Sequence, residues 1–532
     1  MQPLYDAGAV RTADALAEEQ FGLPGAVLME NAGHEAALAL RRLFPQTEKV
    51  CLCCGGGNNG GDGFVLARHL AGRGIFLTVL HTTPADHCTP NARANLRTLH
   101  ALGIPCFLSE TLDDETMDTL LQNHLLAVDA LLGTGSQGAP RGQVARMVQA
   151  LLRFPGPVVA LDVPSGVNAS DGTVASPYVR ATQTFTFLAP KVGLFVSPGA
   201  AACGDVHVLP IGIPAAKILP PHTGVSRWET TEHQLPDRSW HQHKGSFGTV
   251  LVVGGSASYP SAPLLAARAV LRAGGGGVVL AMPESSARYA AVLPEAVHCP
   301  LPGSRVTEEH WSWLTPWFDR VSAVLVGPGL GRHPSTGDLV RRLWAQIPVP
   351  LVADADALFA LSEYTPPRSA PSVVTPHEGE AARLLSCAVE DVRAHRLDSV
   401  RALAARWSCA LLKGAWSLAS DGKDVISCSQ AAPVLAVPGS GDVLSGIVAT
   451  LLAQEMSPLR AAALGSALHA RCGALRAFQQ GDRGMLAEEI ADGLPGAMAW
   501  EAPLPQSLLT QGAPVSPHAL SRGDGGALFH VS

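Results

Sequence analysis

Short apolar runs that end in glycine, aspartate or another polar residue recur along both halves of the chain. In the first half such runs cover residues 49–54, 76–81, 125–130 and 158–163, with helix-like segments between them. Alternation of apolar strands with helices is typical of βαβ units, whose strands are parallel. Ligands gather at the carboxyl edge of such a sheet, so the residues that follow these runs are site candidates. The sequence therefore predicts an α/β protein with doubly wound, mostly parallel sheets.

Glycine-rich or polar loops follow three of these runs in the first half. The loops are residues 55–63, 133–138 and 164–166. We expect the first loop to lead into a helix over residues 64–73, an arrangement that places backbone donors on a phosphate. Asp129 and Asp162 end the runs before the other two loops. A single glycine after a strand is often only a turn, but three loops and two carboxylates at one edge predict a binding site.

The second half repeats this arrangement. Its apolar runs are residues 249–253, 278–281, 321–326, 351–353, 372–374 and 410–412. Most are followed by polar or glycine residues, among them Gly327-Pro328-Gly329, Asp354, Thr375-Pro376-His377 and Lys413-Gly414. We therefore expect a second parallel sheet with a site of its own at the carboxyl edge.

The segment from Pro438 to Ser445 has the composition of an anion-binding loop. Gly439 and Gly441 free the backbone so that successive N–H groups can point into one cavity, and the apolar residues 443–453 predict a helix that stabilises an anion at its N-terminus. A carboxylate there repels a resting phosphate, so we expect Asp442 to take a proton from a hydroxyl that attacks phosphorus. The other interpretation is a Gly-Ser turn with Asp442 as an ordinary helix cap.

Composition excludes several classes of protein. A chain of 532 residues can hold two large domains or three smaller ones. The net charge is −7 and Lys and Arg are scattered, so small metabolites are expected as partners and nucleic acid is not. Neither a signal-peptide pattern nor an apolar run long enough to cross a membrane is present in the sequence.

Eleven cysteines, an odd number, indicate reduced thiols and a cytoplasmic protein. Cys51, Cys53 and Cys54 share one apolar run, which favours buried structural thiols over a metal site. The expected organisation is a first domain over residues 1–212, a Pro-rich linker over 213–236, a second domain over 237–500 and a flexible tail over 501–532.

The second half resembles the ribokinase-like superfamily, within it the branch that repairs hydrated NAD(P)H. The markers are His243-Lys244-Gly245, Gly327-Pro328-Gly329-Leu330-Gly331, Asp354-Ala355-Asp356-Ala357-Leu358, Thr375-Pro376-His377-Glu378-Gly379-Glu380 and Gly439-Ser440-Gly441-Asp442. The first half resembles the companion epimerase domain, which has a Rossmann-like fold. Its markers are Leu28-Met29-Glu30-Asn31-Ala32-Gly33, Gly57-Asn58-Asn59-Gly60-Gly61-Asp62-Gly63 and Leu161-Asp162-Val163-Pro164-Ser165-Gly166. The resemblance covers roughly residues 5 to 498, with the markers in the family's order in both halves.

This resemblance implies an NAD(P)H-hydrate epimerase joined to an ADP-dependent (S)-NAD(P)H-hydrate dehydratase, a cytoplasmic homo-oligomer whose substrates are hydrated NADH, hydrated NADPH and ADP. It places the nucleotide on Lys413, Gly414, Ala415, Trp416, Ser417 and Gly441. It places the hydrated cofactor of the second half near Ala262, Gly329, His377 and Asp442. In the first half it places the cofactor on Asn58, Asn59, Gly60, Gly61, Asp62, Gly133, Thr134, Gly135, Ser136, Gln137, Gly138, Ala139 and Asp162.

The resemblance further implies Mg²⁺ in the second half and a potassium ion in the first, held by Asn59, Asp129 and Ser165. These three side chains offer only oxygen ligands, which suit a hard cation, while the choice of potassium comes from the family. Our candidate acid–base residue for epimerisation is Asp162, with Lys191 as a helper.

Two residues of the second site have ordinary structural interpretations as well. His377 could be a helix cap, and Lys413 could be a solvated surface lysine. Their positions at the ends of apolar runs favour ligand contact in both cases.

The approach to the phosphate loop departs from the family. Where the family has an Asn-Pro-Gly-Met type sequence, this chain has Ala431-Ala432-Pro433-Val434-Leu435-Ala436-Val437-Pro438. Because Pro438 has no N–H, one possible donor to a phosphate is lost, but we expect the cavity to survive around Gly439, Gly441 and Asp442.

Two alternatives to repair stay open. One is a small-molecule kinase of the same fold, acting on a vitamin precursor, whose first half is a relic. The other is a dinucleotide-binding protein without catalytic activity.

Overall fold

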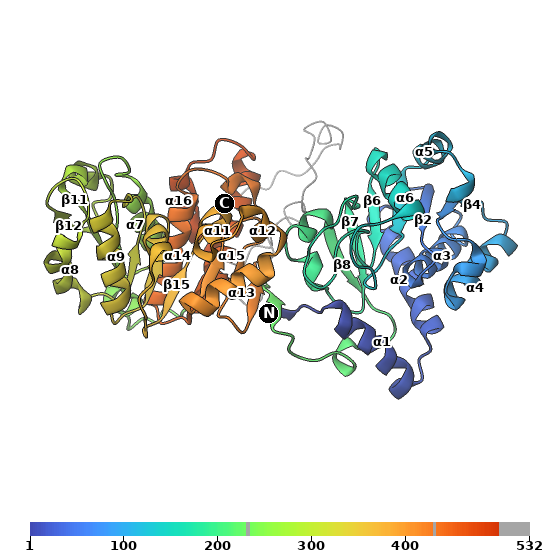
Figure 1. Cartoon of the computed structure of the whole chain (residues 1–532), viewed down its shortest axis with the longest axis horizontal. Coiled ribbons are helices and arrows are strands. Elements are labelled where there is room, and N and C mark those ends of the chain that lie inside the picture. Colours follow the sequence, from blue (N-terminus) through green and yellow to red (C-terminus); the bar gives the residue numbers. More distant parts are fainter. Residues whose placement is uncertain (230–234, 429–431, 500–532) are drawn as a thin grey trace, which may run out of the picture.

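Two α/β units lie side by side in the structure, a computed structural model that describes residues 1–229, 235–428 and 432–499 (Figure 1). The N-terminus lies at the seam between the units. The expected tail over 501–532, and Ala431 of the altered approach, lie outside the described residues.

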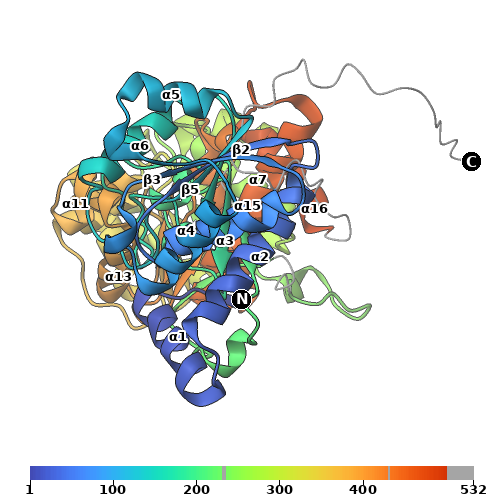
Figure 2. The same cartoon turned by 90° about the vertical axis from the view of Figure 1, so that its right-hand side faces the viewer.

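The smaller sheet has seven parallel strands in the order β4-β3-β2-β5-β6-β7-β8. The strands are β2 (Lys49–Cys54), β3 (Phe76–His81), β4 (Cys106–Leu108), β5 (Leu126–Ala130), β6 (Val158–Leu161), β7 (Gln183–Phe187) and β8 (Asp205–Leu209). The helices are α1 (Ala7–Phe21), α2 (Gly25–Leu43), α3 (Asn58–Ala71), α4 (Pro90–Ala101), α5 (Asp114–Gln122) and α6 (Gly142–Arg153). Helices α2, α3 and α4 cover one face of this sheet, and α5 and α6 cover the other (Figure 2).

The larger sheet has eleven strands in the order β1-β9-β18-β17-β16-β15-β14-β13-β10-β11-β12. The strands are β1 (Gln2–Pro3), β9 (Val225–Arg227), β10 (Thr249–Val253), β11 (Gly277–Pro283), β12 (Val297–Leu301), β13 (Ala323–Val326), β14 (Leu351–Ala353), β15 (Ser372–Val374), β16 (Ala410–Leu412), β17 (Leu418–Ser420) and β18 (Val425–Ser427). From β16 to β12 all neighbours are parallel, whereas β17 is antiparallel to both β16 and β18. Both sheets therefore have the parallel core that the strand-end pattern predicts.

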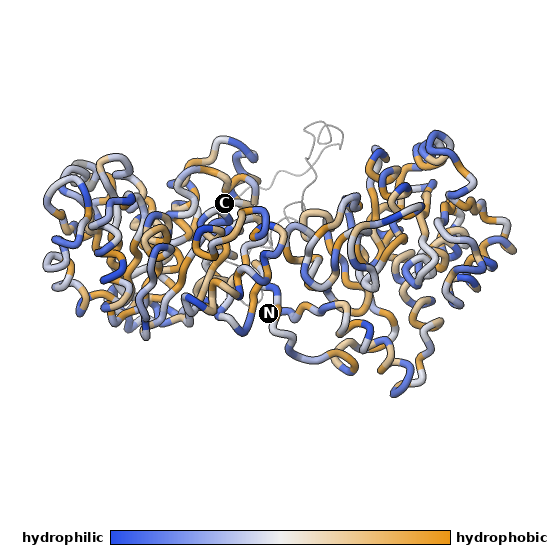
Figure 3. Tube along the Cα trace, viewed as in Figure 1, coloured by the Kyte–Doolittle hydropathy of each residue, from blue (hydrophilic) through white to orange (hydrophobic). Residues whose placement is uncertain are grey.

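Helices sandwich the larger sheet because its strands alternate between two apolar cores. In β10, Val250 and Val252 pack with α7, α14, α15 and α16, while Leu251 and Val253 pack with α9, α10, α11 and α13. The strands run as hydrophobic segments through the interior (Figure 3). The helices of this unit are α7 (Ala262–Arg272), α8 (Trp311–Phe318), α9 (Pro334–Gln346), α10 (Asp356–Glu363), α11 (Glu378–Leu385), α12 (Val389–Ala394), α13 (Arg396–Trp407), α14 (Ser440–Ala453), α15 (Pro458–Gln480) and α16 (Ala487–Met498).

The first residues of the chain belong to the larger sheet, not to the smaller one. Gln2 and Pro3 pair antiparallel with β9, and the Leu4 N–H donates to the Val225 carbonyl at 3.0 Å. The next residue, Tyr5, exchanges backbone hydrogen bonds with the 190–192 segment of the first half. One apolar cluster, which includes Leu4, Phe195 and Val225, runs across this seam. The stretch 213–236, expected as a linker, thus contains strand β9.

Helix α3 begins at Asn58, six residues before the expected start at residue 64, so most of the glycine-rich segment is helical and that expectation is corrected. The glycines are required by packing. A Cβ on Gly60 would lie 1.9 Å from the Gly55 carbonyl oxygen, and one on Gly61 would lie 2.5 Å from the Met29 methyl carbon. These glycines let the first turns of α3 lie close to Gly55 and Met29.

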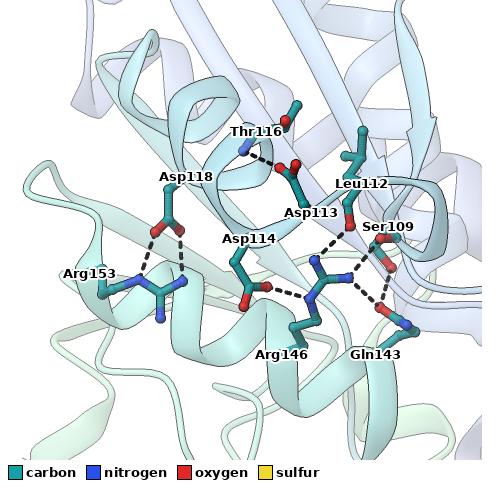
Figure 4. A network of polar contacts seen from close by, with 9 residues as sticks. All are labelled: Ser109, Leu112, Asp113, Asp114, Thr116, Asp118, Gln143, Arg146 and Arg153. Carbon is teal, nitrogen blue, oxygen red and sulfur yellow. Dashed lines mark hydrogen bonds and ion pairs between the residues drawn. The ribbon is translucent and has the colours of Figure 1, made fainter.

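Polar contacts fix helices α5 and α6 to each other on the outer face of the first half (Figure 4). Asp113 caps α5 by accepting a hydrogen bond from the Thr116 N–H at 2.8 Å. Arg153 makes a two-pronged contact with Asp118, 2.8 Å at each prong. Arg146 contacts Asp114 and donates to two backbone carbonyls, those of Ser109 and Leu112.

The clustered cysteines lie on a buried strand, as predicted. Cys51 and Cys53 face the core under α5 and α6, and Cys54 faces the opposite core, so the three thiols cannot converge on one ion. All eleven cysteines are free thiols. Within the described ranges no helix is both long and apolar enough to cross a membrane.

Candidate active sites

The first candidate site lies where β2, β5 and β6 end, because these strands are neighbours in the smaller sheet. Asn59, in the first turn of α3, is 8% exposed. Its side-chain amide donates to the Leu132 carbonyl at 2.8 Å and to the Leu161 carbonyl at 3.2 Å. Its Oδ1 is buried and accepts no hydrogen bond from the residues that the structure describes. A buried oxygen without a donor is costly unless a cation or another ligand satisfies it.

Asp129 and Ser165 lie next to this amide. The Ser165 hydroxyl donates to Asp129 Oδ1 at 2.7 Å, and the Ser165 N–H donates to Oδ2 at 2.8 Å. The same hydroxyl accepts from the Leu132 N–H at 3.0 Å, so Leu132 joins Asn59 to Ser165. Burial raises the pKa of Asp129 to about 6. The structure therefore brings together the three predicted metal ligands, and the unsatisfied amide oxygen fits a hard cation.

Asp162 follows β6 with φ +62°, a left-handed conformation that aspartate tolerates better than most residues. Its Oδ2 accepts from the Thr134 N–H at 3.0 Å, which ties it to the 133–139 loop. Its Oδ1 forms an ion pair with Lys191 Nζ at 2.8 Å. Lys191 is completely buried and donates to the Phe187 carbonyl at 2.6 Å. The predicted acid–base residue and its helper are thus in direct contact.

The loop over 133–139 packs directly on this ion pair. A Cβ on Gly133 would lie 3.0 Å from Asp162 Oδ2 and 3.1 Å from the Asn59 Cβ, so there is little room for a side chain at position 133. A cavity opens beside it, lined in part by Leu132, Gly133, Ser136, Gly138, Pro164 and Gly166. Several predicted cofactor contacts therefore border one cavity, whereas Gly60 and Gly61 are buried in α3 and serve its packing.

Two further carboxylates belong to this site. Desolvation raises the pKa of Asp14, on α1, to about 6, and the negative charge of Asp162 adds to the shift. The pKa of Asp62 is raised well above its usual value by burial and by the charges of Asp162 and Asp14. The sequence motifs include Asp62 but give no signal for Asp14, because Asp14 lies within helix α1 and has neither a glycine-rich segment nor a strand end beside it.

The second candidate site lies at the carboxyl ends of β10, β13, β14, β15 and β16. Lys413, just after β16, donates to Asp354 Oδ1 at 2.6 Å and lies 3.8 Å from Glu380 Oε2. Asp354 is 1% exposed. Lys413 is therefore no surface lysine, and it joins the strand ends of β14 and β16.

Helix α14 begins at Ser440, so Gly441 and Asp442 lie in its first turn and not in a loop before residue 443. Gly439 has φ +85°, and a Cβ there would lie 2.5 Å from the Leu265 Cδ1. The predicted tight turn at the start of a helix is confirmed, despite the altered residues before it.

Asp442 is half-buried, and the pKa of its carboxyl is raised to about 7. Burial is the largest cause, the charges of Asp354 and Glu380 add to it, and Lys413 opposes it. Lys413 Nζ would lie 3.4 Å from a Cβ on Gly441, so the lysine points at the start of α14. A carboxylate with a pKa near neutrality at a helix N-terminus is suited to act as a general base beside a phosphate.

The other nucleotide and cofactor residues predicted for the second half lie at the start of α7 and on the segments that follow β13, β15 and β16. Trp416, after β16, has φ +52°, a conformation that non-glycine residues adopt at tightly constrained sites. Gly329 lies against Ala262, since a Cβ on Gly329 would be 3.1 Å from the Ala262 Cβ. His377 is a helix cap, because its Nδ1 accepts from the Gly379 N–H at 3.0 Å. Its other ring nitrogen lies 3.4 Å from Glu380, and so faces the Lys413 cluster.

Sequence comparisons cover both halves. Residues 25–193 match the family described as YjeF-related protein N-terminus, and residues 250–496 match the family described as NAD(P)H-hydrate dehydratase. A bifunctional NAD(P)H-hydrate repair enzyme of Thermanaerovibrio acidaminovorans is 41% identical over 499 residues, which span 92% of this chain and 96% of that one. This chain belongs to the family of bifunctional NAD(P)H-hydrate repair enzymes.

Other members of this repair family align over the same length. The Moorella thermoacetica enzyme is 38% identical and covers 92% of this chain and 96% of its own length. A crystal structure of the ADP/ATP-dependent NAD(P)H-hydrate dehydratase from Bacillus subtilis covers 52% of this chain and 99% of that chain, at 27% identity and a TM-score of 0.46. The family resemblance inferred from the markers is confirmed, and with it the α/β class with two such units.

Proposed function

We propose that the second half dehydrates the S form of hydrated NAD(P)H at the expense of ADP, and that the first half interconverts the R and S forms. The observation that carries the proposal is the placement of Asp442 at the start of α14, beside Lys413 and with its pKa raised to about 7. Family membership over both halves supports the pairing of the two activities.

In the second half the hydroxyl of the hydrated ring attacks the β-phosphorus of ADP, and Asp442 takes the hydroxyl proton. The bond from the β-phosphorus to the bridging oxygen breaks, which releases AMP. The ring nitrogen then expels the phosphate group as its C–O bond breaks, and a neighbouring ring carbon gives a proton to the departing phosphate, so NAD(P)H and phosphate form. Lys413 and the N–H groups of residues 439–441 stabilise the charge on the transferred group.

In the first half the carbon that bears the hydroxyl must open and close again. Asp162 takes the proton from the hydroxyl and returns it after inversion, while the buried Lys191 holds the carboxylate in place. The backbone of the 133–139 loop orients the cofactor, because Thr134 is bonded to the same carboxylate.

Two metal ions belong to the proposal. Asn59, Asp129 and Ser165 would hold potassium, and the unsatisfied Asn59 Oδ1 supports this assignment. In the described part of the chain, no three or more His, Cys, Asp or Glu side chains form a metal-binding group. Mg²⁺ would enter with the nucleotide phosphates, as it commonly does, and Glu380, 3.8 Å from Lys413, is a carboxylate that could contact it.

The decisive assay uses the purified S and R epimers of hydrated NADH separately, with ADP, and follows recovery of dihydronicotinamide absorbance. We expect recovery from both epimers with the wild type, and from S alone at the early time points with Asp162→Asn. Replacing potassium by choline should slow recovery from R and leave recovery from S unchanged.

The same assay decides against the two alternatives. A protein that recovers no NADH but phosphorylates a hydroxymethyl vitamin precursor would be a kinase, and the assembled first site would then have no function. A binding protein predicts that Asp442→Ala changes neither turnover nor product. Assembly as a homo-oligomer and a cytoplasmic location stay predictions from the sequence.

A further inference from the structure

Arg396, the first residue of α13, lies beneath the loop that follows β16. Its side chain is 1% exposed, which is unusual for arginine. One terminal nitrogen, Nη2, donates to the carbonyl oxygens of Lys413 at 3.3 Å and of Leu412 at 3.4 Å. The guanidinium thus holds the backbone at the point where the strand turns into the 413–417 segment.

Gly414 makes this approach possible. Its φ is +144°, and a Cβ there would lie 3.0 Å from Nη2 and 3.1 Å from Nη1 of Arg396. A side chain at 414 would therefore push the guanidinium out of the turn. Gly414 suggests a nucleotide loop in the sequence, and its missing side chain also leaves the space that the Arg396 guanidinium occupies.

The other terminal nitrogen of Arg396 reaches the second wall of the site. Nη1 forms an ion pair with Glu378, the first residue of α11. The residue before it, His377, caps α11 and lies against Glu380. One buried side chain therefore contacts both the backbone under Lys413 and the helix that begins at the His377 cap.

A neighbouring arginine offers a natural comparison. Arg393 pairs with the other carboxylate oxygen of Glu378 at 2.8 Å, but its side chain is 61% exposed. Exposed ion pairs contribute little to stability, whereas the removal of one partner from a buried pair is strongly destabilising. The two arginines share an acceptor and differ in burial and in the contact with the 412–414 backbone.

We propose that Arg396 is a positioning residue that holds the 413–417 segment and the start of α11 in one fixed arrangement. Its loss should therefore weaken the binding of ADP and of the hydrated cofactor together. The inference rests on the proposed function of this site. We assign Arg396 no contact with either substrate, and we expect Asp442 to keep its place when Arg396 is replaced.

The test compares Arg396→Met, Arg396→Lys and Arg393→Ala in the full chain. The dissociation constant of ADP is measured by calorimetry, and KM and kcat are measured for ADP and for the S epimer of hydrated NADH. The epimerase rate of the first half is a check on each preparation. Arg396→Met should weaken ADP binding and raise the KM of the hydrated cofactor, each about 10-fold or more, as expected for lost charged hydrogen bonds. The value of kcat should stay within about threefold.

The two other variants make the test specific. Lysine keeps a charge beside Glu378 but lacks the second terminal nitrogen that donates to the Leu412 and Lys413 carbonyls, so Arg396→Lys should weaken the binding of ADP more than that of the hydrated cofactor. Arg393→Ala should change neither constant. Equal losses in Arg393→Ala, or a fall in kcat with both constants unchanged, would overturn the proposal. If Arg396→Met does not fold, a wild-type ADP affinity in Arg396→Lys overturns it instead.

Calorimetry separates this proposal from the proposed function. A wild type that binds ADP but returns no NADH contradicts the function, while the ratio of ADP affinities still decides the role of Arg396. A wild type that does not bind ADP overturns both.

Discussion

Each half of the molecule places a lysine against a strand-end aspartate, but the two ion pairs involve different partners. In the first half, the completely buried Lys191 pairs with Asp162, the candidate acid–base residue, at 2.8 Å. In the second half, Lys413 pairs at 2.6 Å with the buried Asp354, and the candidate base Asp442 stays outside the pair. Lys191 thus restrains the candidate acid–base residue itself, whereas Lys413 restrains Asp354 and not the candidate base.

The difference follows from what each carboxylate has to do. A base that takes a proton from an attacking hydroxyl needs a pKa near the working pH, and Asp442, with its pKa raised to about 7, meets that requirement. A residue that takes a proton and returns it to the same substrate needs a fixed position on both passes. Lys191 and the Thr134 N–H supply that position for Asp162.

Asp442→Asn should produce the largest effect. The variant removes the base and keeps the shape, so dehydration of the S epimer should slow about 100- to 10,000-fold. Epimerisation should keep its wild-type rate, because Asp442 lies on α14 of the second half and is no part of the first site. The measurement is NADH recovery from the S epimer, with R-to-S conversion followed by chromatography. A dehydration rate within tenfold of wild type would show that Asp442 is not the base, and the contrast between the two halves would fail.

Asp162→Asn and Lys191→Met test the ion pair of the first half. Both should slow epimerisation by about 100-fold or more. Lys191→Met should also lower the free energy of unfolding by about 3–5 kcal/mol, because it leaves a largely buried carboxylate without its partner. The double variant should regain stability and stay inactive, which chemical denaturation and the R-to-S assay can establish. A Lys191→Met protein with normal stability would contradict the comparison.

The strand-end residues of both sites could be predicted from the sequence because parallel strands fix where their carboxyl ends meet. Asp129, Asp162, His377 and Lys413 all lie at or just after the ends of apolar runs, and the sheet order brings them into two groups. Asp14 could not be found in this way, since α1 reaches the first site only through the fold. The same holds for β1, whose two residues have no periodicity and pair with β9 more than 200 positions away.

The glycine-rich segments show the other limit. In the first half the glycines of residues 55–63 predict a loop, but Gly60 and Gly61 are in helix α3 and have no room for a Cβ. A glycine needed for a turn and one needed for close packing look the same in a sequence. In the second half Gly439 has a positive φ, so the turn interpretation holds there.

The pH dependence should distinguish the two sites, with dehydration losing rate at the higher pH. For the free protein, kcat/KM of dehydration should fall about tenfold per unit below a pH of about 7, because Asp442 must be ionised to accept a proton. Epimerisation should fall only below about 6, where Asp129, with its pKa raised to about 6, becomes protonated and can no longer bind a cation. Both profiles can be recorded on one preparation. If the two activities fell with the same pH midpoint, the charges around Asp442 and Asp129 would not be what sets the pH dependence.

The smallest effects are expected on the outer face of the first half, where Arg146 and Arg153 belong to neither site (Figure 4). Arg153→Ala removes a half-exposed ion pair and should lower the free energy of unfolding by less than about 1 kcal/mol. Arg146→Met leaves two backbone carbonyls without their donor and should lower it by about 1–3 kcal/mol. Both activities should be unchanged, as measured beside chemical denaturation. If either variant altered a rate or a pH midpoint, the sites would respond to distant packing, and the two lysine pairs could not by themselves explain their difference.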